Sequence, residues 1–327
     1  MVRFFKRRSQ EPSKVLVIDP TLGDPHAAML MSDMARRDWR SVHNFLSGIQ
    51  DPDELQHYLN LCANQNGVQA WIDDWIEAEP RSFLPFLVGG AHAIKWAWLG
   101  RGTALAKNTL PAQFRIFERR LRKAHEFLTE AISRNPDDPT AWSELIICGR
   151  GMGLGIDEAV LRFNQALIRH RWHLDAHKNL LNQLLAKWGG SHELSCQFVE
   201  EATVDAPPSS GVSTVVVTAH LEHWVRLESG KDTEYLNSAS TIASLRAAAD
   251  RSVLHPDYRR RLGWQHDFNM FAMPFYQTEQ WDLAGEMFDE IGDQITEWPW
   301  SFFWNPPGAF VKAQDVVKAN RTPRTAS

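Results

Sequence analysis

Cysteine is scarce in this 327-residue chain, which contains only three. Cys62, Cys148 and Cys196 lie far apart, and no two of them form a CxxC pair. An odd number of dispersed cysteines argues against a framework of disulfides. We therefore expect reduced, mostly buried thiols in a cytoplasmic protein.

A basic excess and a long apolar run are missing as well. The formal net charge is -5, which argues against nucleic acid as the main partner because neutralising phosphates requires a basic face. No apolar run approaches the roughly 20 residues that span a bilayer, so we expect no transmembrane segment. The basic start MVRFFKRRSQ lacks the apolar region of a secretory signal. We predict a solvated basic arm over residues 1–20, in which KVLVID could form a short strand.

The remaining composition is that of an ordinary globular protein. Hydrophobic residues make up 43% of the chain and charged residues 23%, which is typical of a chain that buries a sizeable core. We expect one domain over residues 21–313. The segment 314–327 is almost free of apolar residues after Val317, and we expect it to be a disordered tail.

An internal repeat lies in the middle of the chain. The segments AISRNPDDPTAWSEL (131–145) and ALIRHRWHLDAHKNL (166–180) align at a shift of 35 residues. Identical residues then coincide at four places, at which Ala131, Arg134, Ala141 and Leu145 fall on Ala166, Arg169, Ala176 and Leu180. Small residues let paired helices approach, and a proline such as Pro136 ends the second helix. The pattern predicts antiparallel helical hairpins.

These residues resemble tetratricopeptide repeats, whose unit of about 34 residues carries W-x2-L, then A-x3-F, then P. Trp142 with Leu145 and Ala159 with Phe163 match this pattern, whereas Arg171 stands where proline is usual. The match is best over 121–207, and the resemblance implies an all-α fold, an irregular tetratricopeptide-like solenoid of helical hairpins. The segments KWGGSHE, AHLEHW, FNMFAMPF and TEWPW also look like those of a group of uncharacterised bacterial proteins with similar helices.

Histidines are the strongest candidates for chemistry. His173 and His177 are four residues apart, and His220 and His223 are three apart, so each pair would lie on one side of a helix. A metal-dependent enzyme with these four residues between adjacent helices is therefore our alternative hypothesis. Ligand-like spacing is often structural, and we expect no cofactor.

Two further motifs have simpler explanations than catalysis. In GRGMGLG (149–155) the glycines alternate, no lysine follows, and the preceding AWSELIIC reads as helix rather than strand. We interpret it as a turn between paired helices. Cys196 and His192 could touch across one helical turn, but no neighbour in the sequence would orient the histidine. No catalytic residue is predicted.

Tryptophan is abundant, with 14 residues against 4 tyrosines. The segment TEWPWSFFWNPPG concentrates aromatic residues near the C-terminus, and its prolines prevent a long helix. We expect it to cover the last repeat, since the ends of a solenoid must be covered. The alternative is an exposed edge that binds a partner. The candidates for such an edge are Trp298, Trp300, Phe303 and Trp304.

The segment KWGGSHE contains the signals of a helical hinge. Gly189 suits the left-handed position that closes a helix, and Ser191 is a natural N-cap for the next one. A second glycine, Gly190, is not needed for a hinge. It would permit the close approach of a ligand or of another backbone.

Solenoids expose long concave faces that bind peptides or proteins more often than they perform chemistry. Our leading hypothesis is a non-enzymatic, cytoplasmic interaction or scaffold protein that binds a protein or peptide partner in a groove. Polar residues of the first helix in each hairpin would line this groove, and the candidates are Ser143, Glu144, Lys178, Asn179 and Asn182. A second alternative is a regulatory protein with a small-molecule pocket near Trp96, Trp98 and the glycines at 100 and 102.

Overall fold

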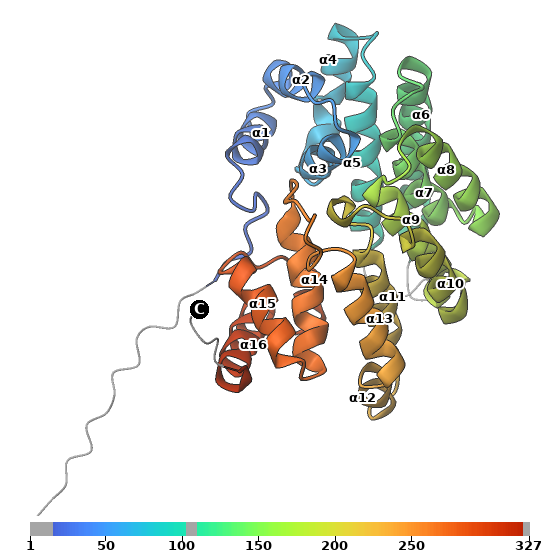
Figure 1. Cartoon of the computed structure of the whole chain (residues 1–327). Coiled ribbons are helices and arrows are strands. Elements are labelled where there is room, and N and C mark those ends of the chain that lie inside the picture. The colour runs from blue at the N-terminus through green and yellow to red at the C-terminus, as the bar shows by residue number, and fades with distance from the viewer. Residues whose placement is uncertain (1–15, 103–109, 323–327) are drawn as a thin grey trace, which may run out of the picture.

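The computed structural model describes residues 16–102 and 110–322 and is all-helical, with no strand in these ranges (Figure 1). Eight helices form the first half of the chain: α1 (Pro25–Ala35), α2 (Trp39–Ser47), α3 (Pro52–Ala63), α4 (Ile72–Ala78), α5 (Leu84–Arg101), α6 (Pro111–Arg134), α7 (Thr140–Met152) and α8 (Gly155–Arg169). The second half contains α9 (Leu174–Leu184), α10 (His192–Thr203), α11 (Thr214–Trp224), α12 (Lys231–Leu236), α13 (Ala239–Asp250), α14 (Trp264–Gln277), α15 (Trp281–Ile291) and α16 (Pro306–Asn320).

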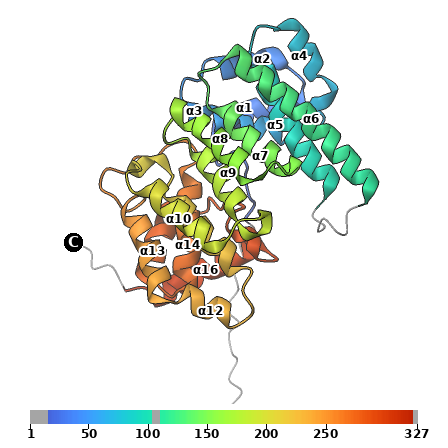
Figure 2. The same cartoon turned by 90° about the vertical axis from the view of Figure 1, so that its right-hand side faces the viewer.

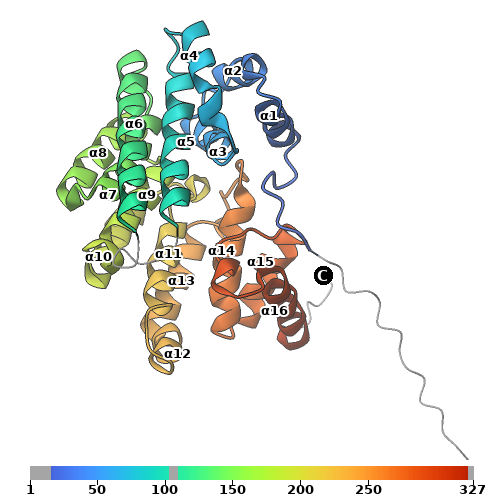
Figure 3. The same ribbon diagram turned by 180° about the vertical axis from the view of Figure 1, so that it is seen from behind.

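Helices that follow one another in the chain pack side by side. The pairs α5 with α6, α7 with α8 and α14 with α15 make extensive contacts, and the two long helices α5 and α6 lie next to each other in Figure 3. Helices α7, α8 and α9 form a layer beside them (Figure 2). The prediction of an all-α fold built from packed helices is confirmed.

The core consists of two large apolar clusters and a smaller one that lies between them. The first cluster joins α1 to α7 and the second joins α9 to α16. The smaller cluster fills the space inside α7–α10 and includes Phe163, Ala166, Ala176 and Leu180. These four residues belong to the segment in which the repeat matches best, so the small and large positions of the repeat are the ones that meet in this core.

Three terminal and hinge features can be compared with the sequence. No strand forms at residues 16–19, and the start of the chain lies outside the described residues. The expected disorder from 314 onward is wrong up to Asn320, because Phe310, Ala313 and Val317 form a buried stripe on α16. At the KWGGSHE hinge, Gly189 has a φ of +93° and Ser191 Oγ accepts from the backbone N–H of Leu194 at 3.1 Å, as predicted.

Candidate functional site

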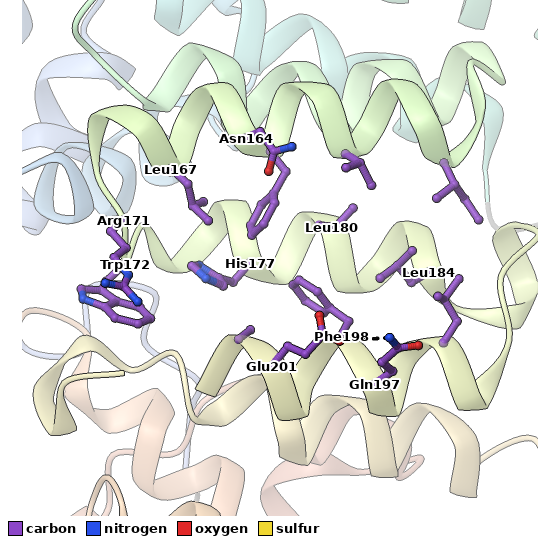
Figure 4. A pocket seen from close by; sticks show the side chains of 15 residues that line it. Asn164, Leu167, Arg171, Trp172, His177, Leu180, Leu184, Gln197, Phe198 and Glu201 are labelled. Carbon is purple, nitrogen blue, oxygen red and sulfur yellow. Dashed lines mark hydrogen bonds between the residues drawn. The ribbon is translucent and has the colours of Figure 1, made fainter. Parts of the chain in front are cut away.

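An apolar groove runs along the outer side of α9, between α8 and α10 (Figure 4). Helix α9 forms its floor, and the two other helices form its walls because each of them packs against α9. The groove has a volume of about 450 Å³. Apolar side chains dominate its lining, namely Ile156, Val160, Phe163, Leu167, Trp172, Leu180, Leu184, Leu194, Phe198 and Ala202.

One buried polar ring interrupts this apolar floor. The Nδ1 atom of His177 lies 2.9 Å from the carbonyl oxygen of His173, and because a carbonyl only accepts, Nδ1 must carry the proton. Burial lowers the pKa of His177 to about 4, so the ring is neutral near pH 7 and its Nε2 is an acceptor. The ring also packs edge-on against Phe163, with centroids 5.1 Å apart. The groove therefore combines an apolar surface with one hydrogen-bond acceptor.

Polar residues stand at the rim of the groove. Asn164 lies on the α8 side, and Gln197 and Glu201 lie on the α10 side. At one end, the guanidinium of Arg171 lies 4.6 Å from the ring centre of Trp172. Its Nη2 atom also lies 3.6 Å from a carboxylate oxygen of the exposed Asp205. A polar rim around an apolar floor is the arrangement found at protein–protein interfaces.

Of the five residues predicted to line a concave groove, three are buried and two are half-buried. Ser143, Glu144 and Asn179 are buried, so they do not offer the exposed polar surface that we expected. Gln56 Nε2 on α3 donates to Glu144 Oε1 at 2.8 Å, and Asn179 Nδ2 on α9 donates to Ser143 Oγ on α7 at 3.1 Å, so these side chains are used in packing between helices. Lys178, like Asn182, is only half-buried and lines a second pocket on the inner face of α9.

The four histidines of the metal hypothesis fall into two pairs with different neighbours. His173 and His177 lie at the start of α9, where the His177 ring packs against Phe163, whereas His220 and His223 lie on α11 beside Tyr235 of α12, whose hydroxyl is 2.7 Å from His220 Nδ1. Across the described residues, no group of three or more histidine, cysteine, aspartate or glutamate side chains is placed to hold a metal ion.

His192 touches Cys196, as the sequence suggested, and belongs to a cluster with His223 and Tyr235 that the sequence did not indicate. Its ring stacks on that of His223 with centroids 3.7 Å apart, and its Nε2 lies 3.1 Å from the hydroxyl of Tyr235 and 3.5 Å from Cys196 Sγ. Burial lowers the pKa values of both histidines and raises that of Cys196. The three groups are therefore neutral near pH 7 and join α10, α11 and α12 without an activated thiolate.

The aromatic segment near the C-terminus contains both of the environments that we considered. Trp300 is fully buried and its Nε1 donates to Asn269 Oδ1 at 2.8 Å, whereas Trp304 is fully exposed. Trp298 and Phe303 are half-buried. Because α16 follows this segment and packs against α15, Trp300 lies inside the helical stack rather than at its end.

The segment at Trp96 and Trp98 offers only a small cavity of about 170 Å³, beside Trp96. The guanidinium of Arg120 covers the Trp96 ring at 3.6 Å, and Trp98 packs edge-on against Phe117. The three cysteines are free, and Cys62 and Cys148 are buried as expected.

Comparison of the sequence with models of protein families and with curated proteins finds no match. In residues 16–102 and 110–322, no helix has the length and apolar character needed to cross a bilayer. The groove was not anticipated from the sequence, although one signal could have indicated it. Leu167 on α8 and Leu194 on α10 each lie near the surface of the second helix of a hairpin. A hairpin that packs on its inner side alone would carry polar residues at these positions.

Proposed function

We propose that this chain is a helical-repeat interaction protein, located in the cytoplasm, that binds an amphipathic α-helix of a protein partner in the groove between α8 and α10. The observation that carries the proposal is the groove itself, an apolar trough of about 450 Å³ in which all lining polar residues except His177 stand at the rim. Recognition of a helix in a groove relies on an apolar face laid into such a trough.

The walls of the groove favour a helix over an extended strand. An extended peptide gains affinity by pairing its backbone with the free edge of a sheet, and the described residues contain no strand. The walls are instead formed by side chains such as Val160, Leu167 and Leu194, which project from helices. Apolar residues spaced three or four apart on a partner helix would fit between them.

The charge of the groove lining also restricts the partner. Arg171 and Glu201 are the charged residues that line it, and their charges cancel. An apolar face is therefore the main requirement on the partner. A donor on the partner, such as a serine hydroxyl or an indole N–H, would add specificity if it lay over His177 Nε2. A partner without this donor would bury the acceptor without a hydrogen bond, which is unfavourable.

The test uses the full chain and a displayed library of amphipathic helical peptides. We expect selection of peptides with apolar residues at i, i+3, i+4 and i+7. Leu167→Glu, which places a charge in the groove wall, should weaken binding of a selected peptide by at least about tenfold, or about 1.4 kcal/mol, in a fluorescence anisotropy titration.

Leu161 provides the matched control on the same helix. It is 61% exposed and does not line the groove, so Leu161→Glu should change the dissociation constant less than about twofold. Selection of polar peptides only, or equal loss of affinity in the two variants, would rule out the groove as the binding site. Circular dichroism of both variants checks that they remain folded.

A further inference from the structure

A second pocket, of about 250 Å³, lies on the inner face of α9, opposite the groove. Helices α9, α11 and α14 form its walls, and Trp298 adds an aromatic surface. Nine residues line it, of which all but Met270 and Trp298 are polar or charged: Lys178, Asn182, Thr214, Thr218, Glu222, His266, Asp267, Met270 and Trp298. Small-ligand sites commonly lie between helices and combine apolar surface with a few placed polar groups.

The two carboxylates of this pocket already have cationic partners. Asp267 is buried and accepts from Arg261 Nη2 at 2.6 Å. Glu222 accepts from Lys187 Nζ at 2.8 Å and from Arg226 Nη1 at 2.6 Å. Four cations, counting Lys178, therefore surround the three carboxylates Asp267, Glu222 and Asp175, so the pocket is not an acidic cluster although the chain is negative overall.

Other polar groups in the pocket are left with unused capacity. Lys178 Nζ makes one ion pair, with Asp175 at 3.4 Å. The side chain of Asn182 donates to the carbonyl of Lys178, and its Oδ1 accepts nothing from any described residue. The imidazole of His266 makes no hydrogen bond with the described residues, and burial lowers its pKa to about 3. A neutral imidazole supplies one donor and one acceptor.

Four segments that the sequence singled out meet around this pocket. Glu222 comes from AHLEHW, Met270 from FNMFAMPF and Trp298 from TEWPW. Lys187 of KWGGSHE donates to Glu222. The helical packing thus brings residues from four distant parts of the chain to one cavity.

We infer that this pocket binds a small zwitterion of the size of a free amino acid. Lys178 and His266 would hold the carboxylate of the ligand, and Glu222 with Asn182 Oδ1 would hold its ammonium group. The three charged side chains of the lining, Lys178, Glu222 and Asp267, carry both signs and form ion pairs with residues outside the lining and not with one another. A ligand with both charges can meet both signs of the lining, whereas a ligand with one charge would also face a side chain of like charge across the cavity. Met270 and Trp298 would contact the side chain of the ligand.

The test is calorimetric titration of the full chain with each of the twenty free L-amino acids. We expect at least one to bind with a dissociation constant of about 1 mM or lower. The analogue of that amino acid without its amino group should bind at least about tenfold more weakly, because it cannot engage Glu222 and Asn182. Absence of binding across the panel, or equal affinity for the deaminated acid, would overturn the inference.

Variants then locate the site. Lys178→Met should weaken binding at least about tenfold, whereas Lys231→Met, a change at an exposed lysine on α12 that pairs with Glu228, should leave it unchanged. Equal binding by wild type and Lys178→Met would place the ligand elsewhere and overturn the assignment. If Lys178→Met does not fold, Asn182→Leu replaces it with the same expectation. Leu167→Glu in the groove should bind the amino acid normally, so this inference can fail independently of the proposed function.

Discussion

Gly190 shows how a single hydrogen atom in place of a side chain sets the path of the chain. A Cβ atom added at this residue would lie 1.8 Å from the carbonyl oxygen of Leu184. The neighbouring Gly189 has open space around it but adopts a φ of +93°. The two glycines of the hinge are therefore required for different reasons, one for close approach of backbone and the other for a left-handed turn.

The two glycines should differ in their cost on substitution. Gly190→Ala forces two backbone segments apart, and we expect it to lower the free energy of unfolding by about 3 kcal/mol. Gly189→Ala places only a methyl group on a left-handed residue, which should cost about 1 kcal/mol. Urea denaturation of the two variants measures both values. A larger effect at Gly189 would show that the hinge is limited by backbone conformation instead.

At the scale of elements, the aromatic segment between α15 and α16 connects three helices. Trp300 contacts Phe288 of α15 and Phe310 of α16, with ring centroids 6.0 and 5.2 Å apart. Its indole N–H bonds to Asn269 of α14. A short 3₁₀ turn, Trp300–Phe302, holds the ring between these helices. This one side chain therefore contributes to the packing of the last helix against the rest.

Substitution of two tryptophans of this segment should change the stability of the protein to very different extents. Trp300→Ala removes a fully buried ring and the shorter of the two hydrogen bonds to Asn269 Oδ1, and we expect a loss of about 3 to 5 kcal/mol in the free energy of unfolding. Trp304 is fully exposed, so Trp304→Ala should change that free energy by less than about 0.5 kcal/mol. Thermal unfolding followed by circular dichroism compares them. A large effect at Trp304 would instead point to a contact made by the exposed ring.

The helices themselves could be predicted because their signals are local. The spacing of Ala124, Leu128 and Ala131 is enough to define a buried stripe on α6, and all three are buried. The burial of Glu144 could not be predicted in this way, because it depends on Gln56, 88 residues earlier in the chain. The end of α16 was missed for a similar reason, since its buried residues Phe310, Ala313 and Val317 join a core formed with α14 and α15.

At the scale of the whole molecule, α3 fastens the first half of the chain to the second. Asp53 accepts from the backbone N–H of Leu174 and lies 3.0 Å from His170 Nε2. One turn and two turns further along α3, Gln56 bonds to Glu144 and Asn60 bonds to Asp175. Polar side chains at one face of α3 thus connect it with α7 and α9.

The contact between Asp53 and His170 should make the stability of the protein depend on pH. The hydrogen bond with Asp53 raises the pKa of His170. The contribution of this pair to the free energy of unfolding is therefore fully present below the pKa of the unfolded chain, about 6.5, and is lost as the pH rises through the pKa of the folded protein. His170→Gln keeps a donor but cannot be charged. Near pH 5.5 we expect the free energy of unfolding of wild type to exceed that of this variant, by less than about 1 kcal/mol because the pair is partly exposed. Near pH 8 we expect the two free energies to be equal. Urea denaturation at both values measures the difference, and a difference independent of pH would contradict this reading.

The candidate sites were predictable only in part. We expected Lys178 and Asn182 to line a groove for a protein partner, and the structure places them in the pocket between α9, α11 and α14. Their neighbours in that pocket, such as His266 and Trp298, come from helices whose docking has no local signal. The groove depends in the same way on the distance between α8 and α10, which the repeat pattern alone does not specify.

Helix α9 presents His177, Leu180 and Leu184 to the outer groove and Lys178 with Asn182 to the inner pocket. One helix of eleven residues is therefore a shared wall of two compartments. A ligand that shifts or stiffens this wall from one side alters the free energy of occupying the other side. Thermodynamic linkage requires this coupling to be reciprocal, so a partner helix would change the affinity for a small molecule by the same factor as the small molecule changes the affinity for the helix.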